Sequence, residues 1–310
     1  MQSFQKKRMW MRVAVLALLG LAVLKTAGPI LSAPRRAKHV IVVGCDALTP
    51  DGIRNSRTPN LDRLLREGAH TFRARAVMPT IGNTNWASMF MGAGPEQHGI
   101  TSNKWQPYRP ALAPTCKGSG RIFPTIFGLL REQQPSAKIG CFFDWGGFAR
   151  LVEPKAASRM YDGKGPHDTI ARAILFLLEK KPDLTFIQFD HIDRSLHRSG
   201  HGSAQYIRAV EEADRLIGQM LNALIAAEML NETVILVASD HGGKGKLHGG
   251  SSAAEMEIPW IIYGPGTARG KEITAPVNIY DTAATLAYLL GVKTPSCWIG
   301  RPVRQAFANF

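Results

Sequence analysis

Residues 39–46 read HVIVVGCD and mark the centre of this chain. From His39 to Cys45 the side chains are almost continuously apolar, without the polar alternation of a strand that has one face in water. Such a run is typical of a central strand in a parallel sheet, which is buried on both faces. Asp46 follows at once, at the carboxyl end, where open α/β sheets bind their ligands.

The rest of the chain alternates strand-like and helix-like segments. Further strands are expected at residues 71–77, 137–143, 184–189, 233–239 and 258–263. Helices are expected at residues 59–68, 85–91, 123–132, 167–181, 204–230 and 281–290. This succession predicts one α/β domain over residues 34–310, built as a three-layer sandwich with a central, mostly parallel sheet and helices on both faces.

The cysteines fall into two groups. Cys116 lies in the Pro- and Gly-rich segment 105–120, which is expected to form a surface excursion and in one interpretation part of a substrate cap. Cys297 lies in a similar loop within an expected short tail after residue 294, so these two could form a disulfide. Cys45 and Cys141 end apolar runs and are expected to be buried thiols. Four cysteines are compatible with an oxidising compartment without requiring disulfides.

The net charge of +14 is concentrated near the N-terminus, where eight Lys and Arg residues precede the first acidic residue, Asp46. The remaining +6 favours a mildly basic cleft for an anionic substrate, and no nucleic-acid polymer is expected as a partner. The apolar run at 13–24 is short for a membrane-spanning helix but suits a signal peptide. Residues 1–33 are therefore expected to be a signal peptide or an uncleaved N-terminal anchor, with the domain in the periplasm or outside the cell.

Carboxylates and imidazoles follow several of the apolar runs. Asp193 and His197 are four residues apart, so one helical turn would place both on the same face. Asp190, His191 and His201 crowd the same segment, and the two histidines are expected to be supporting or surface groups. The alternative is a solvated polar loop, but so many such groups after an apolar strand favour a metal-binding loop.

Asp240 and His241 form the most specific pair. Adjacent side chains normally point apart, so both reach one metal only where the strand breaks, and Gly242 and Gly243 permit that break. His248 follows in a flexible loop that contains Gly and Lys. A Gly-rich hairpin with incidental histidines is the weaker interpretation.

The ends of neighbouring parallel strands meet at one edge of a sheet, so six side chains are expected to converge on one cleft. They are Asp46, Asp193, His197, Asp240, His241 and His248. Taken alone, Asp46 fits a turn or capping role as well as it fits metal binding. Together the six suit a pair of Zn²⁺ ions, or other divalent ions that accept mixed nitrogen and oxygen ligands.

In this order along the chain, these residues resemble the metal-site motifs of the alkaline phosphatase superfamily. The resemblance is strongest to its type I phosphodiesterase/nucleotide pyrophosphatase branch. Residues 78–100, which begin with MPT and end with PEQHGI, resemble the nucleophile region of that branch. Residues 255–260 (EMEIPW) resemble the segment after its last histidine. The resemblance covers residues 40–290 and implies an alkaline-phosphatase-like fold.

The resemblance also implies a role for each residue. One metal, usually zinc, would be held by Asp193, His197 and His248, and the other by Asp46, Asp240 and His241. Asn103 falls where the family places an Asn that donates to a phosphate oxygen, and its alternative role is that of a turn residue.

The sequence departs from the family at the nucleophile. The family has Thr or Ser shortly before the helix expected to start at Asn85, and the matching position here is Gly82, followed by Asn83. Neither can attack phosphorus. Thr84 is the nearest hydroxyl and the candidate catalytic residue, with the N-cap of that helix as its alternative role. A metal-bound hydroxide could attack instead, and loss of activity is the remaining alternative.

The leading prediction is hydrolysis of phosphodiester or pyrophosphate bonds in small, nucleotide-like phosphoesters by two divalent ions, with Zn²⁺ favoured. The alternatives are a catalytically silent homologue that binds metal or phosphate, and a phosphotransferase outside the cytoplasm. A formylglycine sulfatase is disfavoured because no Cys is followed by Pro and Arg two and four residues on. A Ser-His-Asp hydrolase would need a G-x-S-x-G elbow, which is missing. Membrane contact is expected only through the N-terminal segment, and the oligomeric state is left open.

Overall fold

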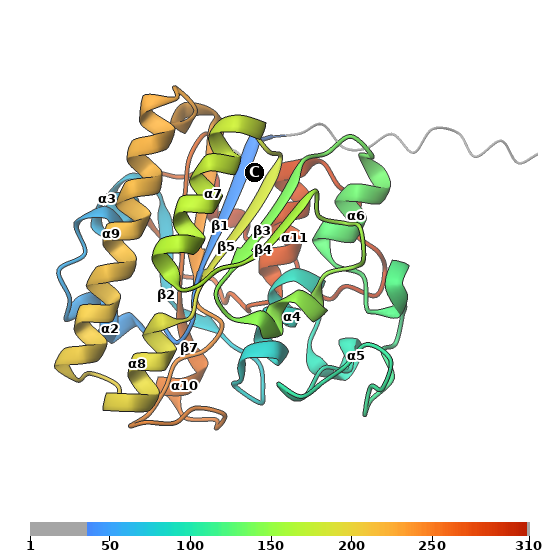
Figure 1. Ribbon diagram of the computed structural model, residues 1–310, viewed down its shortest axis with the longest axis horizontal. Helices are drawn as coiled ribbons and strands as arrows, with labels where there is room; N and C mark the ends of the chain where they lie inside the picture. Colours follow the sequence, from blue (N-terminus) through green and yellow to red (C-terminus); the bar gives the residue numbers. More distant parts are fainter. Residues whose placement is uncertain (1–35, 309–310) are drawn as a thin grey trace, which may run out of the picture. The chain divides into compact units, whose positions relative to one another are not determined.

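The computed structural model of the protein describes residues 36–308 (Figure 1). The expected signal peptide or anchor at residues 1–33 lies outside this range. Within the described residues, no helix has the length and apolar character that crossing a bilayer demands.

An eight-stranded sheet lies at the centre, with the strand order β4-β3-β5-β1-β6-β7-β2-β8. The strands are β1 (His39–Cys45), β2 (Ala69–Arg75), β3 (Ile139–Phe143), β4 (Arg159–Asp162), β5 (Leu184–Phe189), β6 (Thr233–Ala238), β7 (Glu257–Tyr263) and β8 (Lys271–Glu272). Strand β1 is buried throughout and pairs in parallel with β5 and β6. Only β7 runs antiparallel to its neighbours, β6 and β2. The predicted mostly parallel sheet with β1 inside it is confirmed.

Helices cover both faces of the sheet, as predicted (Figure 1). One face carries α2 (Pro50–Arg54), α3 (Pro59–Glu67), α7 (Pro166–Lys180), α8 (His191–Ser199) and α9 (Ala204–Ala226). The other carries α4 (Gly82–Met91), α6 (Ile126–Gln133) and α11 (Asp281–Leu290). Alternate side chains of β1 supply the two cores, Ile41 and Val43 on the first face and Val40 and Val42 on the second.

Short helices complete the connections. They are α5 (Pro95–His98), α10 (Ala253–Met256) and the 3₁₀ turns η1 (Ser119–Arg121), η2 (Gly146–Leu151), η3 (Leu230–Glu232) and η4 (Arg304–Ala306). Strand β4 was not predicted, because its exposed, polar sequence RMYD carries no apolar run and only its pairing with β3 makes it a strand.

Helix α4 begins three residues earlier than expected. It starts at Gly82 with Ile81 as its N-cap, although residues 82–84 have the composition of a polar turn. Contacts from elsewhere in the chain hold the first turn, since the Asn83 N–H donates to Asn103 Oδ1 at 2.8 Å. Asn85 braces the preceding segment by accepting from the Val77 N–H at 2.7 Å. Tertiary hydrogen bonds therefore override the local turn signal.

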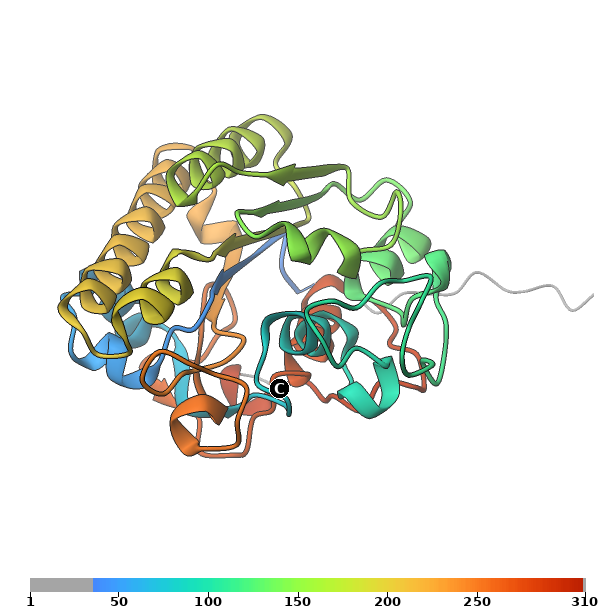
Figure 2. The same cartoon turned by 60° about the horizontal axis from the view of Figure 1, so that its bottom comes forward.

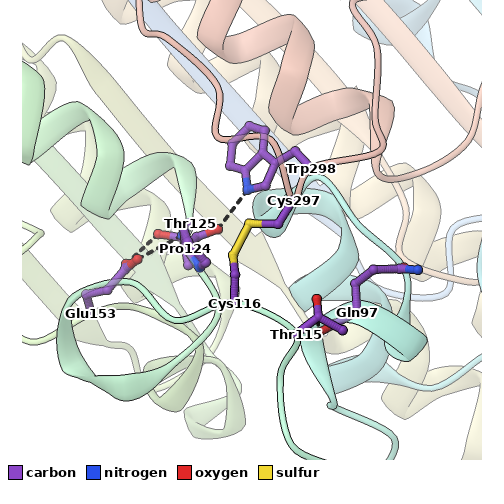
Figure 3. Close-up of a disulfide and its surroundings, with 8 residues drawn as sticks. All are labelled: Gln97, Thr115, Cys116, Pro124, Thr125, Glu153, Cys297 and Trp298. Carbon is purple, nitrogen blue, oxygen red and sulfur yellow. Dashed lines mark hydrogen bonds between the residues drawn. A yellow bond between two sulfur atoms is a disulfide. The ribbon is translucent and has the colours of Figure 1, made fainter.

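A disulfide joins Cys116 to Cys297 across 181 residues (Figure 3). It fastens the surface excursion to the segment that follows α11, and the Trp298 indole beside it donates to Pro124 O at 3.0 Å. The short tail expected after residue 294 packs onto the domain, because Trp298, Val303 and Ala306 are all buried. Cys45 and Cys141 are free and buried, as predicted.

Candidate two-metal centre

The candidate site lies where β1, β5 and β6 end. Gly44 of β1 is level with Gln188 of β5 and with Ala238 of β6, so these three strands finish at one edge of the sheet. Figure 2 turns this edge toward the viewer. Asp46 follows β1 directly, and Asp240 follows β6 after one residue. Helix α8 begins immediately after Asp190 at the end of β5.

Asp193, His197 and His248 form one cluster. His197 Nε2 lies 3.3 Å from Asp193 Oδ2, and His248 Nε2 lies 3.7 Å from Asp193 Oδ1. The two Nε2 atoms are 3.2 Å apart. Asp193 and His197 share one face of α8, as their spacing of four predicts.

Asp46, Asp240 and His241 form the second cluster. His241 Nε2 lies 3.4 Å from Asp46 Oδ1 and 3.3 Å from Asp240 Oδ2. The clusters adjoin, because ligand atoms of Asp46, Asp193 and His241 also lie within 4.8 Å of one another. The rings of His241 and His248 stack with their centroids 3.9 Å apart. The structure thus brings together all six side chains that the sequence singled out.

Each of the three histidines turns its Nε2 toward the cluster. The Nδ1 atoms donate to backbone carbonyls at 2.8–2.9 Å, namely His197 to Lys246, His241 to Gly242 and His248 to Thr80. A carbonyl can only accept, so each neutral ring carries its lone pair on Nε2. Backbone acceptors of this kind commonly orient metal-binding histidines. The arrangement fits a divalent cation.

Some carboxylate oxygens of the site accept no hydrogen bond from the protein. Asp193 Oδ1 and Asp240 Oδ2 are buried without a hydrogen-bond partner. Burial, and after it the neighbouring carboxylates, raises the pKa of Asp46 well above its usual range. Burial followed by the charge of Asp193 raises the pKa of Asp240 to about 8. Divalent cations would offset this repulsion, so the donor set fits the metals that the resemblance implies.

Two residues that sequence reasoning missed hold Asp46. Its Oδ2 accepts hydrogen bonds from Trp86 Nε1 at 3.3 Å and from Gln188 Nε2 at 3.2 Å. These bonds leave Oδ1 on the side of His241. Gln188 did carry a signal, because it is the one amide in the mostly apolar strand β5.

The role of Thr80 was also missed, and this residue fastens the loop that carries His248. Its Oγ1 donates to Gly250 O at 2.7 Å and accepts from the Gly249 N–H at 3.0 Å. Its carbonyl accepts from His248 itself. Thr80 therefore positions a candidate ligand across a large separation in sequence.

Asn103 lies at the N-terminus of α4. Its Oδ1 accepts from the Asn83 N–H, so its amide nitrogen remains as the side-chain donor. A Cβ added at Gly82 would lie 3.7 Å from Asn103 Oδ1 and 3.2 Å from the ring of Trp145. Position 82 thus faces Asn103 and Trp145 without offering a hydroxyl.

Thr84 does not cap α4. The N-cap is Ile81, so the alternative role as N-cap residue is wrong, because the helix starts too early for it. Thr84 lies within the first turn and is fully buried, and its Oγ1 has no hydrogen-bond partner.

The model of the family described as type I phosphodiesterase / nucleotide pyrophosphatase matches residues 40–245. The chain belongs to this family. The match includes Asp46, Asp193, His197, Asp240 and His241, and His248 lies just beyond its end.

Among the relatives is ectonucleotide pyrophosphatase/phosphodiesterase family member 1 of Mus musculus. It is 22% identical over 254 residues, which cover 77% of this chain and 27% of the relative. The chain therefore spans about a quarter of the length of this curated relative.

Solved structures of the superfamily share the fold. Murine ectonucleotide pyrophosphatase/phosphodiesterase 5, as an inactive variant in complex with AMP, superposes with a TM-score of 0.72 at 17% identity. The match covers 87% of this chain and 100% of that one. A mutant of the alkaline phosphatase PafA gives a TM-score of 0.74 at 11% identity, covering 89% and 100% of the two chains. The predicted alkaline-phosphatase-like fold is confirmed.

Proposed function

We propose that this protein hydrolyses phosphodiester or pyrophosphate bonds in small, nucleotide-like phosphoesters and depends on two divalent metal ions, most simply Zn²⁺. The observation that carries the proposal is the convergence of three carboxylates with three Nε2 atoms at the end of the sheet. Membership of the type I phosphodiesterase family supports it. So does the fold shared with a phosphodiesterase that is described in complex with AMP.

The ligands would divide between two metals. One would be held by Asp193, His197 and His248, and the other by Asp46, Asp240 and His241. Cations bound there would withdraw negative charge from the phosphoryl oxygens and favour in-line displacement.

Asn103 would bind the substrate. Its amide nitrogen, left free by the bond between its Oδ1 and Asn83, would donate to a non-bridging phosphoryl oxygen. Thr84 is the candidate attacking hydroxyl within the chain. It is fully buried, so it would reach a substrate only after the first turn of α4 rearranges.

The test is hydrolysis of bis(p-nitrophenyl) phosphate by the purified full-length chain, before and after chelation, alongside measurement of bound metal. We expect turnover that stops on chelation and returns with Zn²⁺. Activity that survives complete metal removal would overturn the mechanism.

A second candidate is a catalytically silent protein that binds metal or phosphate. Gly82 favours it, because the ring of Trp145 lies against the position where a nucleophile would stand. Gly82→Ser introduces the smallest hydroxyl there, and Trp145 need shift by only a few tenths of an ångström. Turnover in Gly82→Ser together with an inert, metal-binding wild type establishes the silent protein.

The opposite outcome establishes the enzyme and locates its nucleophile. In that case the wild type is active, Thr84→Ala abolishes activity and Thr84→Ser retains it. Thermal unfolding of the two variants controls for the buried position of Thr84.

We also propose that the domain works outside the cytoplasm, in the periplasm or beyond the cell, with residues 1–33 as signal peptide or anchor. The Cys116–Cys297 disulfide supports an oxidising compartment. Cell fractionation of the full-length chain tests this, and a soluble cytoplasmic protein with reduced Cys116 and Cys297 would contradict it.

A further inference from the structure

The loop between β6 and α10 has an exposed tip beside the candidate metal centre. Residues 244–247 (KGKL) close on themselves, because the Lys244 N–H donates to Leu247 O at 2.8 Å and the Leu247 N–H donates back at 3.2 Å. Leu247 is 71% exposed, the second-largest exposed fraction among the large apolar side chains of residues 36–308. The next residue is the candidate ligand His248, so the tip stands at the rim of the site. Figure 2 shows this orange loop on the edge turned forward.

The tip is fastened to the end of α8. Lys246 O accepts from His197 Nδ1 at 2.9 Å, and Gly245 O accepts from the His201 N–H at 2.7 Å. Beneath it, Leu196 packs so closely that a Cβ added at Gly243 would lie 2.3 Å from Leu196 Cδ1. These contacts hold Leu247 outward, and its exposure is a fixed property of the loop.

Three cations lie on the tip and on the segment that the tip contacts. Arg198, Lys244 and Lys246 are all exposed, and none of them takes part in an ion pair among residues 36–308. Neither of the segments that carry them, 194–210 and 241–254, contains an acidic residue. The nearest following carboxylate, Glu255, is engaged by Ser252 Oγ at 2.6 Å and the Gly250 N–H at 2.8 Å.

A second exposed apolar side chain belongs to the same rim. Met78 is 44% exposed and stands two residues before Thr80. Thr80 bonds both His248 and Gly249, so the segment with Met78 runs alongside the base of the tip. The segment that carries Met78 contains no acidic residue between Glu67 and Glu96.

We propose that this rim, formed by Met78, Arg198, Lys244, Lys246 and Leu247, docks on an anionic lipid surface. Single apolar side chains that protrude between cations insert among lipid headgroups, while the cations are attracted to anionic lipids. Large contiguous apolar patches often mark protein–protein contacts, whereas the rim offers separate protruding side chains among cations. Docking in this way would turn the mouth of the metal centre toward the lipid surface. The proposal does not depend on catalytic activity.

The experiment uses the full-length chain with an environment-sensitive dye on Leu247→Cys. Labelling is selective, because Cys45 and Cys141 are buried and the other two cysteines are bonded. The matched control carries the dye on Leu175→Cys, which replaces a leucine of α7 that is 59% exposed. We expect a blue shift at position 247 with phosphatidylglycerol-containing vesicles, none with phosphatidylcholine alone, and none at position 175.

Adding Lys244→Glu and Lys246→Glu to the labelled protein should weaken the vesicle titration at position 247 by roughly tenfold or more, because two attractive charges become repulsive. The local dye separates docking by this rim from binding through the basic N-terminal segment, which all variants retain. The proposal is overturned by an unchanged dye at position 247, by equal shifts at positions 175 and 247, by an equal shift with neutral vesicles, or by a titration that the charge reversal leaves intact.

Discussion

The two halves of the candidate site, the ligand clusters at the strand ends and the N-terminus of α4, are assembled in different ways. The ligands come from the ends of three neighbouring strands and from the loop that Thr80 fastens, and each imidazole is oriented by a backbone carbonyl. At α4, two hydrogen bonds join Asn83 to Asn103, and Trp145 lies against Gly82. The candidate ligands stand outside α4, although Trp86 of α4 supports Asp46, so a replacement at Gly82 alters the candidate attacking position without touching a ligand.

The largest effect should follow from Asp193→Asn, because Asp193 belongs to both groups of ligand atoms. We expect the affinity for metal to fall by more than about 100-fold. This exceeds the loss in affinity that typically follows the replacement of a residue that only supports a ligand. Titration calorimetry with Zn²⁺ measures it, and Asp162→Asn on exposed β4 is the control. Equal affinities in the two variants would show that Asp193 binds no metal.

Gln188→Leu should weaken metal binding less, by about 10- to 100-fold, because Gln188 only positions Asp46. The replacement is apolar and of similar size within a buried strand. A matched measurement on Gln219→Leu, at an exposed position of α9, should give the wild-type value. An unaltered affinity in Gln188→Leu would mean that Trp86 alone suffices to hold Asp46.

The contribution of Asp240 to the stability of the metal-free protein should fall as the pH rises from about 4 to 8. Burial raises the pKa of Asp240 from 3.8 to about 8, so over this window the folded state binds the proton that the unfolded state has released. The expected slope is at most about 1.4 kcal/mol of unfolding free energy per pH unit. Denaturant unfolding after chelation measures it.

Two comparisons check this assignment. Asp240→Asn should flatten the slope, and added Zn²⁺ should reverse it. A pH dependence that Asp240→Asn leaves unchanged would contradict the assigned cause.

The smallest effect is expected on the α4 side. Gly82→Ala adds a helix-favouring methyl group but presses it to 3.2 Å from Trp145, so the two contributions oppose each other. Unfolding free energy should change by less than about 1 kcal/mol, and metal affinity should stay at the wild-type value. A loss of metal binding in Gly82→Ala would show that the first turn of α4 also supports the ligands, beyond the bond from Trp86 to Asp46.

Much of the ligand half was predictable from local patterns. The apolar run before Asp46 indicates a strand buried on both faces, and such strands end together at one edge. The spacing of Asp193 and His197 indicates one helix face, which α8 provides. The glycines after His241 indicate the break in the strand. Each of these signals is contained within a few residues of the chain.

The supporting contacts were not predictable in this way. Thr80 meets His248, Gln188 meets Asp46 and Asn103 meets Asn83 across long stretches of chain, and no local pattern records those meetings. The same holds for the buried segment after residue 294, which the disulfide and Trp298 attach to the domain.

Periodicity and composition specify which side chains are buried and which elements form, because those follow from the repeat of a strand or a helix and from the hydrophobic effect. For this protein they predicted an α/β domain with helices on both faces of its sheet, and the Asp and His residues after the apolar runs added the six candidate ligands, whereas the alkaline-phosphatase-like fold was implied by the family resemblance. The direction of each imidazole, the early start of α4 and the ring of Trp145 over Gly82 arise from partners distant in sequence. Their positions are set by packing and hydrogen bonding in the folded chain, and they govern whether the metal centre has an attacking group.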